Sequence, residues 1–521
     1  MRTWALLTCA IFLCGFEAVL SAKILFLFPL PFASHYRIFT PLIDELASRG
    51  HNITAYTSEY FKRKDPTPNF REIVVHLGPD TPNIDDIDVM ELGRMSIVRS
   101  TIQEVATFSA VTESALKSAE LQDLMMSEAK FDLIIMEATS VQEALLAFGH
   151  KFGAPVVNLH PFYLSVGMGL MTGTPNPLSC VPDFRVPYTD HMSFLERTHN
   201  ALIGLFDVVY GSLWHVPRQE SIMRRNFKYP GSNMLPPLEE LLANISLHLV
   251  DAHPMMYVRP YSFNVIDVAG MNIKPAQRLP PDLQKFMDEA PEGVIYFSLG
   301  SYIQPNMLKE HVRRAFEETF KKVKYRVIWK QSEPVEGATE NILQKSWLPQ
   351  NEILAHPNCK LFVTHGGYNS LVEAMTAGVP VLGLPVFVDQ HHNVAYYEHM
   401  GVGLGADVES LTAEEFSEKI ERIINTPSFE ENAKHVARIY RDMPETSLER
   451  AVWWVEYVLR HNGAHHLKPV SVSMSVFKYF LLDVIAFWLF VVVIVIYITY
   501  KLPVVAFKKI KSRAARKKIN K

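Results

Sequence analysis

The chain has 521 residues, of which 48% are hydrophobic and 20% are charged, and its formal net charge is −4. This composition excludes a disordered or low-complexity protein, and the length is sufficient for two globular domains.

Residues 1–22 have the pattern of a cleavable secretory signal. One early Arg is followed by an apolar core and by small residues at Ser21 and Ala22. The alternative is a first transmembrane helix, but Glu17 interrupts the apolar run too early for one.

Residues 23–275 show an alternation of strand and helix patterns. Unbroken apolar runs and helical periodicity predict strands at 23–28, 52–56, 131–136 and 155–159, and helices at 38–50 and 143–153. Such repeated βαβ units predict a parallel α/β domain. The Pro-rich stretch 174–188 predicts a long loop, and binding residues often lie in such loops.

A second α/β series occupies residues 290–462. The Pro-rich and charged segment 274–293 predicts an interdomain linker. The following apolar runs predict strands at 293–301, 325–330, 359–365 and 379–385. Amphipathic helices at 412–425, 429–443 and 447–461 are expected to close the body.

The segment HGGYNS joins one of these strands to a helix that is expected to end at Gly378. Gly366 and Gly367 allow a close backbone approach, and the N–H groups of the helix start attract an anion, so the turn is a candidate diphosphate cradle. An alternative needs no ligand, because Ser370 and Glu373 also fit a capping box.

The wider stretch from Trp347 to Gln390 resembles the signature of the membrane-bound UDP-glycosyltransferases, which include the UDP-glucuronosyltransferases. Details around ASHYRIF and FDLIIMEA are more similar to the invertebrate branch of that family. The resemblance extends from about Lys23 to the C-terminus. It implies the GT-B architecture, in which two Rossmann-like α/β domains face each other across a cleft, with acceptor binding in 23–275 and UDP-sugar binding in 290–462.

The resemblance also implies a role for each matching residue. Trp347 would stack on uracil, Gln350 would contact the nucleoside, and Glu373 would bind the ribose hydroxyls. The diphosphate would be held by His365, Asn369 and Ser370, with Gly367 in the turn and Ser301 in SLGS. Asp389 and Gln390 would bind the sugar. Arg259 in YVRP matches an Arg that approaches the donor, although a salt bridge is an equal alternative.

His35 is the candidate general base. Sugar transfer to a hydroxyl requires removal of the acceptor proton, and PFASHY lies at the expected mouth of a crevice in an open α/β sheet. The family resemblance implies a carboxylate partner for this His at the end of a later strand, where this chain has Glu137 in place of the family's Asp. Asp132 is an alternative orienting carboxylate, and a charge at a helix N-terminus is an alternative role for Glu137.

The C-terminal end predicts a membrane anchor. Residues 480–500 are apolar and long enough to span a bilayer, with Asp483 near the start. Residues 501–521 carry nine Lys or Arg and no acid, which predicts a cytosolic tail and a lumenal body. Nucleic-acid binding by this basic run is disfavoured because it directly follows a span. The ending KKINK resembles a displaced dilysine signal and favours a single-pass type I protein of the endoplasmic reticulum membrane.

Asn52 and Asn244 lie in glycosylation sequons, which fit a lumenal body. Cys180 and Cys359 remain after the signal is removed, and whether they pair is open. No Cys/His spacing of a metal site is present. Asp86 and Asp88 form a D-x-D, but they lie in an acidic stretch without a preceding strand, so a solvated surface is expected.

These observations predict inverting transfer of a hexose from a UDP-sugar to a hydroxyl of a small lipophilic acceptor, as in detoxification. UDP-glucose is the favoured donor and UDP-glucuronate the alternative; the UDP-sugar is a co-substrate, and neither a cofactor nor a metal is expected. A noncatalytic carrier of small lipophiles is the alternative from a different class of function. A dinucleotide-dependent oxidoreductase is disfavoured because GxGxxG is absent after the first strand. A homo-oligomer remains open.

Overall fold

The computed structural model describes residues 21–58, 68–257, 259–303, 307–331 and 337–519. The predicted signal therefore lies almost wholly outside the described residues. The chain forms two compact units, Met1–Lys468 and Pro469–Lys521, which are described separately.

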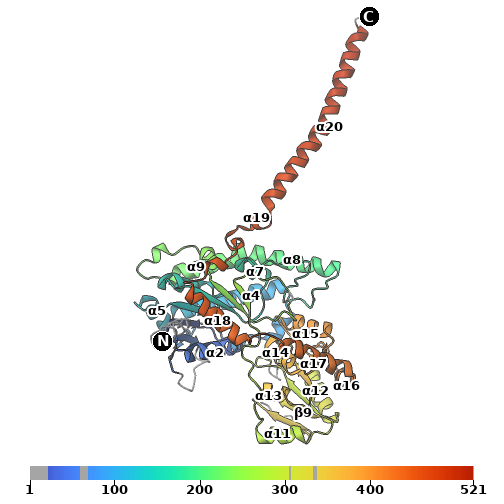
Figure 1. Ribbon diagram of the computed structural model, residues 1–521. Coiled ribbons are helices and arrows are strands. Elements are labelled where there is room, and N and C mark those ends of the chain that lie inside the picture. Colours follow the sequence, from blue (N-terminus) through green and yellow to red (C-terminus); the bar gives the residue numbers. More distant parts are fainter. Residues whose placement is uncertain (1–20, 59–67, 258, 304–306, 332–336, 520–521) are drawn as a thin grey trace, which may run out of the picture. The chain divides into compact units, whose positions relative to one another are not determined.

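A parallel sheet of seven strands organises the first half of the larger unit (Figure 1). Its order is β3-β2-β1-β4-β5-β6-β7. The strands are β1 (Lys23–Phe28), β2 (Asn52–Ser58), β3 (Phe70–Val75), β4 (Leu133–Met136), β5 (Val156–His160), β6 (Leu247–Val250) and β7 (Val265–Asp267). Helices cover both of its faces, which is why β4 is apolar throughout and β1 is apolar after Lys23, without an alternation of polar residues.

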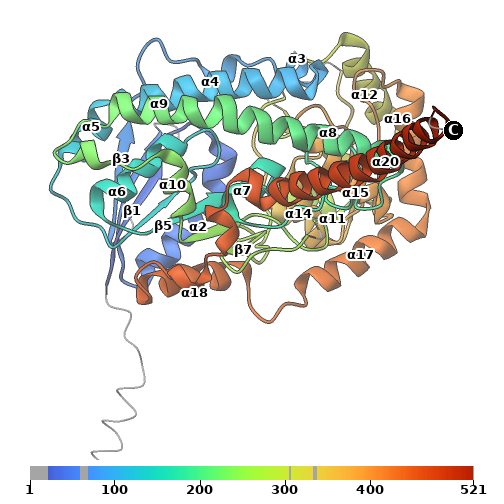
Figure 2. The same ribbon diagram turned by 90° about the horizontal axis from the view of Figure 1, so that it is seen from above.

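The helices of this half connect successive strands. They are α2 (Ala33–Ser48), α3 (Val89–Arg94), α4 (Ile97–Lys117), α5 (Ala119–Met126), α6 (Ala147–Phe152), α7 (Val166–Thr172), α8 (Phe194–Tyr210), α9 (Val216–Asn226) and α10 (Leu238–Ala243). A π-helical turn, η4 (Gly211–His215), joins α8 to α9, and the three segments form one continuous rod (Figure 2).

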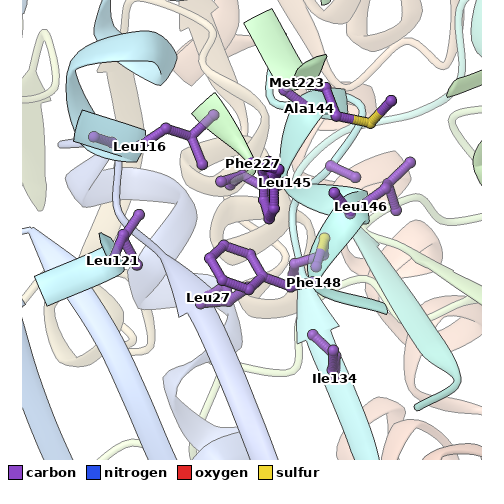
Figure 3. Packing of buried hydrophobic residues seen from close by; sticks show 14 of the residues in the cluster. Leu27, Leu116, Leu121, Ile134, Ala144, Leu145, Leu146, Phe148, Met223 and Phe227 are labelled. Carbon is purple, nitrogen blue, oxygen red and sulfur yellow. The ribbon is translucent and has the colours of Figure 1, made fainter. Parts of the chain in front are cut away.

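An aromatic pair lies at the centre of one core cluster in this half. The rings of Phe148 in α6 and Phe227 after α9 meet edge to face, with centroids 4.9 Å apart. Leu27 of β1 and Ile134 of β4 belong to the same cluster, so the helices are packed directly onto the central strands (Figure 3). Burial of this apolar surface is the main force that holds the sheet and its helices together.

A second parallel sheet, of six strands, organises the other half. Its order is β10-β9-β8-β11-β12-β13. The strands are β8 (Val294–Ser298), β9 (Arg326–Lys330), β10 (Ile342–Lys345), β11 (Cys359–Thr364), β12 (Val381–Gly383) and β13 (Gly403–Gly405). The helices of this half are α11 (Pro281–Asp288), α12 (Glu310–Lys322), α13 (Gln350–Leu354), α14 (Tyr368–Ala377), α15 (Gln390–His399), α16 (Ala413–Asn425) and α17 (Pro427–Arg441), and α18 (Ser447–Arg460) follows them along the chain.

Two segments differ from the expected division of the chain. The predicted linker contains helix α11, whose Leu283 and Met287 are buried in the core of the second half. Helix α18 closes the first half rather than the second, because it packs against α2 and β6 and buries Val452 and Val455 beside the first sheet. Amphipathic periodicity predicts that a helix has a buried face but not which sheet buries it.

The smaller unit consists of short turns and α19 (Val476–Tyr479), followed by the long helix α20 (Leu482–Ile519). By length and composition, Leu482–Arg516 is able to cross a membrane. The helix does not stop at residue 500, and the basic tail continues it.

Candidate active site

His35 and Glu137 meet where the strand order of the first sheet reverses. His35 lies in the first turn of α2 after β1, rather than in a loop, and Glu137 directly follows β4. The neighbouring strands β1 and β4 pair Leu27 with Met136, which brings the two side chains together. His35 Nδ1 and Glu137 Oε1 are 2.9 Å apart, and Glu137 is buried. Open α/β sheets bind ligands at such switch points.

Asp132 lies at the opposite end of β4 from Glu137. Its Oδ2 accepts a hydrogen bond from the backbone N–H of Lys23 at 2.7 Å, so it holds the start of β1 beside the start of β4. The carboxylate that contacts His35 is therefore Glu137, and Asp132 has a structural partner of its own.

Aromatic rings surround His35. The centroids of Phe32 and Phe162 are 4.9 and 6.0 Å from its imidazole. Phe108 of α4 packs edge to face on Phe32, and Phe184 packs on Phe162. The base candidate thus faces an apolar and aromatic environment, and Phe184 comes from the Pro-rich loop.

The HGGYNS turn has the geometry of an anion cradle. Gly366 has φ of 83°, a left-handed conformation that favours Gly. Gly367 is the N-cap of α14, and no side chain caps the helix. The capping-box alternative is therefore wrong, because Ser370 lies inside the helix. The backbone N–H of Tyr368, the first residue of α14, donates to the carboxylate of Asp389. Asn369 and Ser370 follow in the same first turn, whose N–H groups have no partner within the helix.

His365 lies between the two glycine-containing turns that follow β8 and β11. A Cβ added to Gly300 would come within 2.7 Å of the His365 ring, and one added to Gly367 within 2.5 Å of its Nε2. Burial, assisted by the charge of Lys330, lowers the pKa of His365 to about 4. Its imidazole is therefore neutral at pH 7.

Gln350 links the residues expected at the nucleoside. Its Oε1 accepts a hydrogen bond from the hydroxyl of Tyr296 at 3.1 Å, and its Nε2 donates to Ser370 Oγ at 3.1 Å and to Glu373 Oε2. Burial raises the pKa of Glu373 to about 7. The structure thus gathers Gln350, Ser370 and Glu373 in one hydrogen-bonded group.

Trp347 is exposed and carries two cations over its ring. The guanidinium carbon of Arg37 and the ammonium of Lys330 are 4.9 and 5.0 Å from the ring centroid. They border a cavity of about 280 Å³ whose lining also includes Gly300, Ser301 and Trp347. Sequence reasoning missed Arg37 and Lys330. Their positions along the chain could have indicated a place near the site, because Arg37 is two residues after His35 and Lys330 is the last residue of β9, the strand beside β8.

Asp389 is the N-cap residue of α15. Burial raises its pKa to about 6, and its Oδ2 accepts from Asn393 Nδ2 at 2.6 Å. The charge of His35 is a smaller influence that opposes this shift of the pKa. Gln390 is buried, and its Oε1 accepts from the backbone N–H groups of Val386 and Phe387. Its carbonyl oxygen holds the loop before α15.

Arg259 is engaged within the first half. Its guanidinium donates to the backbone carbonyl of Leu164 and, at 2.7 Å, to Asn176 Oδ1. In the D-x-D stretch, Asp88 caps α3 by accepting from the N–H groups of Met90 and Glu91.

The comparisons with known proteins agree with this geometry. The model of the family described as "UDP-glucoronosyl and UDP-glucosyl transferase" matches residues 23–517. The chain belongs to this UDP-glycosyltransferase family. It is 35% identical to "UDP-glycosyltransferase UGT5" of Dactylopius coccus over 92% of this chain and 91% of that one. It is 29% identical to human "UDP-glucuronosyltransferase 2B15", with 93% of each chain covered.

Solved structures confirm the GT-B fold of this UDP-glycosyltransferase. "UDP-glucose: anthocyanidin 3-O-glucosyltransferase in complex with UDP" superimposes with a TM-score of 0.57 at 17% identity, covering 85% of this chain and 99% of that one. The kitacinnamycin glycotransferase superimposes with a TM-score of 0.58 at 16% identity, covering 84% and 99%. The predictions of family, two-domain fold and glycosyltransferase activity are confirmed.

The remaining predicted positions lie on the surface or outside the site. Asn52 and Asn244 are exposed. Cys180 and Cys359 are both free, so they do not pair. Among the described residues, one group with metal-ligand chemistry has its ligand atoms within 4.8 Å of one another: Asp190, His191 and His399. The predicted roles of individual site residues, the absence of a metal requirement and glycosylation stay predictions.

Proposed function

We propose that this UDP-glycosyltransferase transfers glucose from UDP-glucose to a hydroxyl of a small lipophilic acceptor, with inversion at the anomeric carbon. One observation carries the proposal: His35 Nδ1 lies 2.9 Å from the buried carboxylate of Glu137, at the switch point of the first sheet. A histidine held by a carboxylate in this way has the arrangement that removal of an acceptor proton requires.

His35 would remove the acceptor proton. When Glu137 accepts the Nδ1 hydrogen, the lone pair of the other ring nitrogen, Nε2, is left free to take a proton from the acceptor hydroxyl. The buried carboxylate of Glu137 would then stabilise the imidazolium that forms. Attack by the acceptor oxygen from the face opposite the diphosphate breaks the sugar–phosphate bond and inverts the anomeric centre.

The N-terminus of α14 would stabilise the departing diphosphate. The backbone N–H groups of Asn369 and Ser370 and the hydroxyl and amide groups of Ser301, Asn369 and Ser370 are donors that match phosphate oxygens, and the neutral imidazole of His365 lies beside them. Arg37 and Lys330 add positive charge beside the cavity. Donors of this kind support a transfer without a metal ion.

The positions of the cations support glucose over glucuronate as the donor sugar. A carboxylate sugar would need a cation beside it, whereas two nitrogens of the Arg259 guanidinium donate to Leu164 and Asn176. Arg37 and Lys330 lie at Trp347, where the uracil is expected. The family alone does not decide the sugar, since relatives are named as glucuronosyl-, glucosyl- and galactosyltransferases. UDP-glucuronate remains the second candidate because of the likeness to the human glucuronosyltransferases.

The lipophilic acceptor is inferred from the rings around His35. Phe32, Phe108, Phe162 and Phe184 would surround the aglycone and exclude water from the base. Detoxification of small phenols and alcohols is a role that suits such a site.

We also propose that the protein is a single-pass type I protein of the endoplasmic reticulum membrane. The apolar helix from Leu482 and the basic residues after Tyr500 support a cytosolic C-terminus. The exposed Asn52 and Asn244 would then carry sugars in the lumen.

Purified full-length protein in detergent tests the enzymatic proposal. UDP release is measured with UDP-glucose or UDP-glucuronate, with and without a phenolic acceptor. Acceptor-dependent release should be faster with UDP-glucose. Faster release with UDP-glucuronate would overturn the donor assignment, and binding of the phenol with no release from either donor would favour the carrier.

A further inference from the structure

One side of helix α15, in the second half, contacts the loop between α7 and α8 of the first half. His392 Nδ1 donates to the backbone carbonyl of Val186 at 3.1 Å. The hydroxyl of Tyr396 accepts from the backbone N–H of Asp190. His392, Tyr396 and His399 are four and three positions apart, so they lie on the same side of the helix. The loop therefore runs along α15 toward the end of that helix.

The last contact on this side of α15 has metal-ligand chemistry. The rings of His191 and His399 have centroids 5.0 Å apart, and His191 Nδ1 lies 2.9 Å from Asp190 Oδ1. One ligand atom from each of these three residues lies within 4.8 Å of the other two. Ligand atoms that share a tetrahedral ion are about 3.3–3.6 Å apart, given metal–ligand bonds of about 2.0–2.2 Å. Side-chain movements of about 1 Å would therefore bring all three onto one ion.

The position of the three side chains favours a cation. His191 and His399 are exposed and Asp190 is half-buried, so an ion can reach them from solution. Asp190 contributes a negative charge, and His399 is the last residue of α15, where the helix dipole also attracts a cation. An ion pair of Asp190 with His191 needs no third residue. A metal ion uses all three, including the imidazole that the other half contributes.

The ligand set favours divalent transition metals over Mg²⁺ and Ca²⁺. Imidazole nitrogens suit Zn²⁺, Ni²⁺ and Cu²⁺, whereas Mg²⁺ and Ca²⁺ are held by oxygen ligands. Two imidazoles and one carboxylate leave the fourth position of a tetrahedral Zn²⁺ to a water molecule. The sequence alone does not indicate this site, because His399 is far along the chain from the other two ligands.

We propose that Asp190, His191 and His399 bind a Zn²⁺ ion that ties the loop between α7 and α8 to helix α15. The ion would link the two halves of the larger unit. The loop carries Phe184, one of the rings packed around the candidate base, and α15 begins directly after Asp389. The ion would thus hold together two segments that contribute to the candidate active site. Its role is to fix the loop, and the sugar transfer proposed above does not pass through it.

Calorimetric titration with Zn²⁺ tests the site in the full-length chain. The protein is purified in detergent without a polyhistidine tag and carries Cys180→Ser, which removes an exposed thiol. We expect saturable binding that an excess of Mg²⁺ does not displace. His191→Ala and His399→Ala should each weaken it more than about tenfold, since the loss of even an outer partner of a metal site costs that much. The matched control is His311→Ala, at an exposed position of α12, which should bind Zn²⁺ like the parent chain.

Hydrogen exchange shows whether the ion bridges the two halves. With Zn²⁺, the backbone amides of residues 188–192 should exchange several-fold more slowly, because the ion fixes the loop on α15. This protection should disappear in His399→Ala, although the substituted residue belongs to the other half. His311→Ala should keep it.

Three results would overturn the proposal. The absence of saturable Zn²⁺ binding would show that the three residues do not form a site. Unchanged affinity in both His191→Ala and His399→Ala would place the ion on other groups. Protection of the loop that persists in His399→Ala would show that the loop alone holds the ion. None of these measurements depends on catalysis, so the donor and acceptor proposals would be unaffected.

Discussion

At the scale of single residues, the His35–Glu137 contact is the main support for a base mechanism. We expect His35→Ala to lower kcat by about 10²- to 10⁴-fold, the usual contribution of general acid–base catalysis. The dissociation constant of UDP should stay near the wild-type value, because the base acts on the acceptor. Steady-state turnover and calorimetric UDP titration measure the two quantities. Wild-type turnover would remove His35 from the mechanism.

Substitutions distinguish the roles of the two candidate carboxylates, Glu137 and Asp132. Glu137→Gln should reduce kcat on the order of 10²-fold, because the amide cannot stabilise the imidazolium. Asp132→Asn is the control and should cost less than about threefold, since its partner is the Lys23 amide at the far end of the strand. Circular dichroism checks that both variants fold. A larger loss in Asp132→Asn would contradict the assignment of Glu137.

The raised pKa of Asp389 predicts that binding of the UDP-sugar depends on pH. Its raised pKa of about 6 means that the carboxylate is mostly protonated at pH 5 and mostly ionised at pH 7. An ionised acceptor binds sugar hydroxyls more strongly, so affinity for the UDP-sugar should rise about fivefold over this range. The affinity for UDP alone should change less over this range, through Glu373 with its pKa of about 7, and Asp389→Asn should reduce the change seen with the UDP-sugar. A pH-independent affinity in the wild type would exclude Asp389 as a sugar ligand.

At the scale of elements, the turn before α14 depends on the absence of a side chain at Gly367. A Cβ there would lie 2.5 Å from His365 Nε2 and would displace the ring. Gly367→Ala should therefore weaken UDP binding at least about tenfold, because two or more donors lose their alignment. Gly211→Ala is the matched control, since nothing lies within 4 Å of its added Cβ. Calorimetric titration of both variants with UDP measures the two dissociation constants. Equal values would contradict the role of the HGGYNS turn in binding the diphosphate.

At the scale of the whole molecule, the C-terminal helix predicts how the protein is attached to the membrane. A chain that ends before Phe480 lacks the apolar helix. After sonication has opened the microsomes in physiological buffer, this chain should appear in the supernatant, whereas the full chain should stay in the pellet even in alkaline carbonate. Immunoblots of pellet and supernatant measure this. Retention of the truncated chain in the pellet of opened vesicles would contradict attachment by the C-terminal helix alone.

The orientation of the chain in the membrane is also a property of the whole molecule. On intact microsomes, protease should remove only the tail after Lys501 and leave the body protected. The body of the truncated chain should still carry sugars at Asn52 and Asn244, detected as a mobility shift on deglycosylation. Digestion of the body in sealed vesicles would contradict a lumenal location.

The sequence alone determined the features that depend on near neighbours along the chain. Mainly apolar runs such as 23–28 and 359–365 identify buried parallel strands, because both faces of such strands are covered by helices. The glycines of HGGYNS likewise predict a tight turn, and the apolar run near the end of the chain predicts a spanning helix, from neighbouring residues alone. These local patterns, together with the family resemblance, were sufficient for the two-domain fold and for the segments that form the site.

Only the tertiary structure decided which distant groups meet. It placed Glu137 rather than Asp132 against His35. The two carboxylates flank β4 at its opposite ends, and only the end with Glu137 lies beside His35. It also packed α18 against the first sheet rather than the second. Periodicity shows that a helix has two unlike faces. What each face contacts depends on packing between segments far apart in the chain, and no local pattern records that packing.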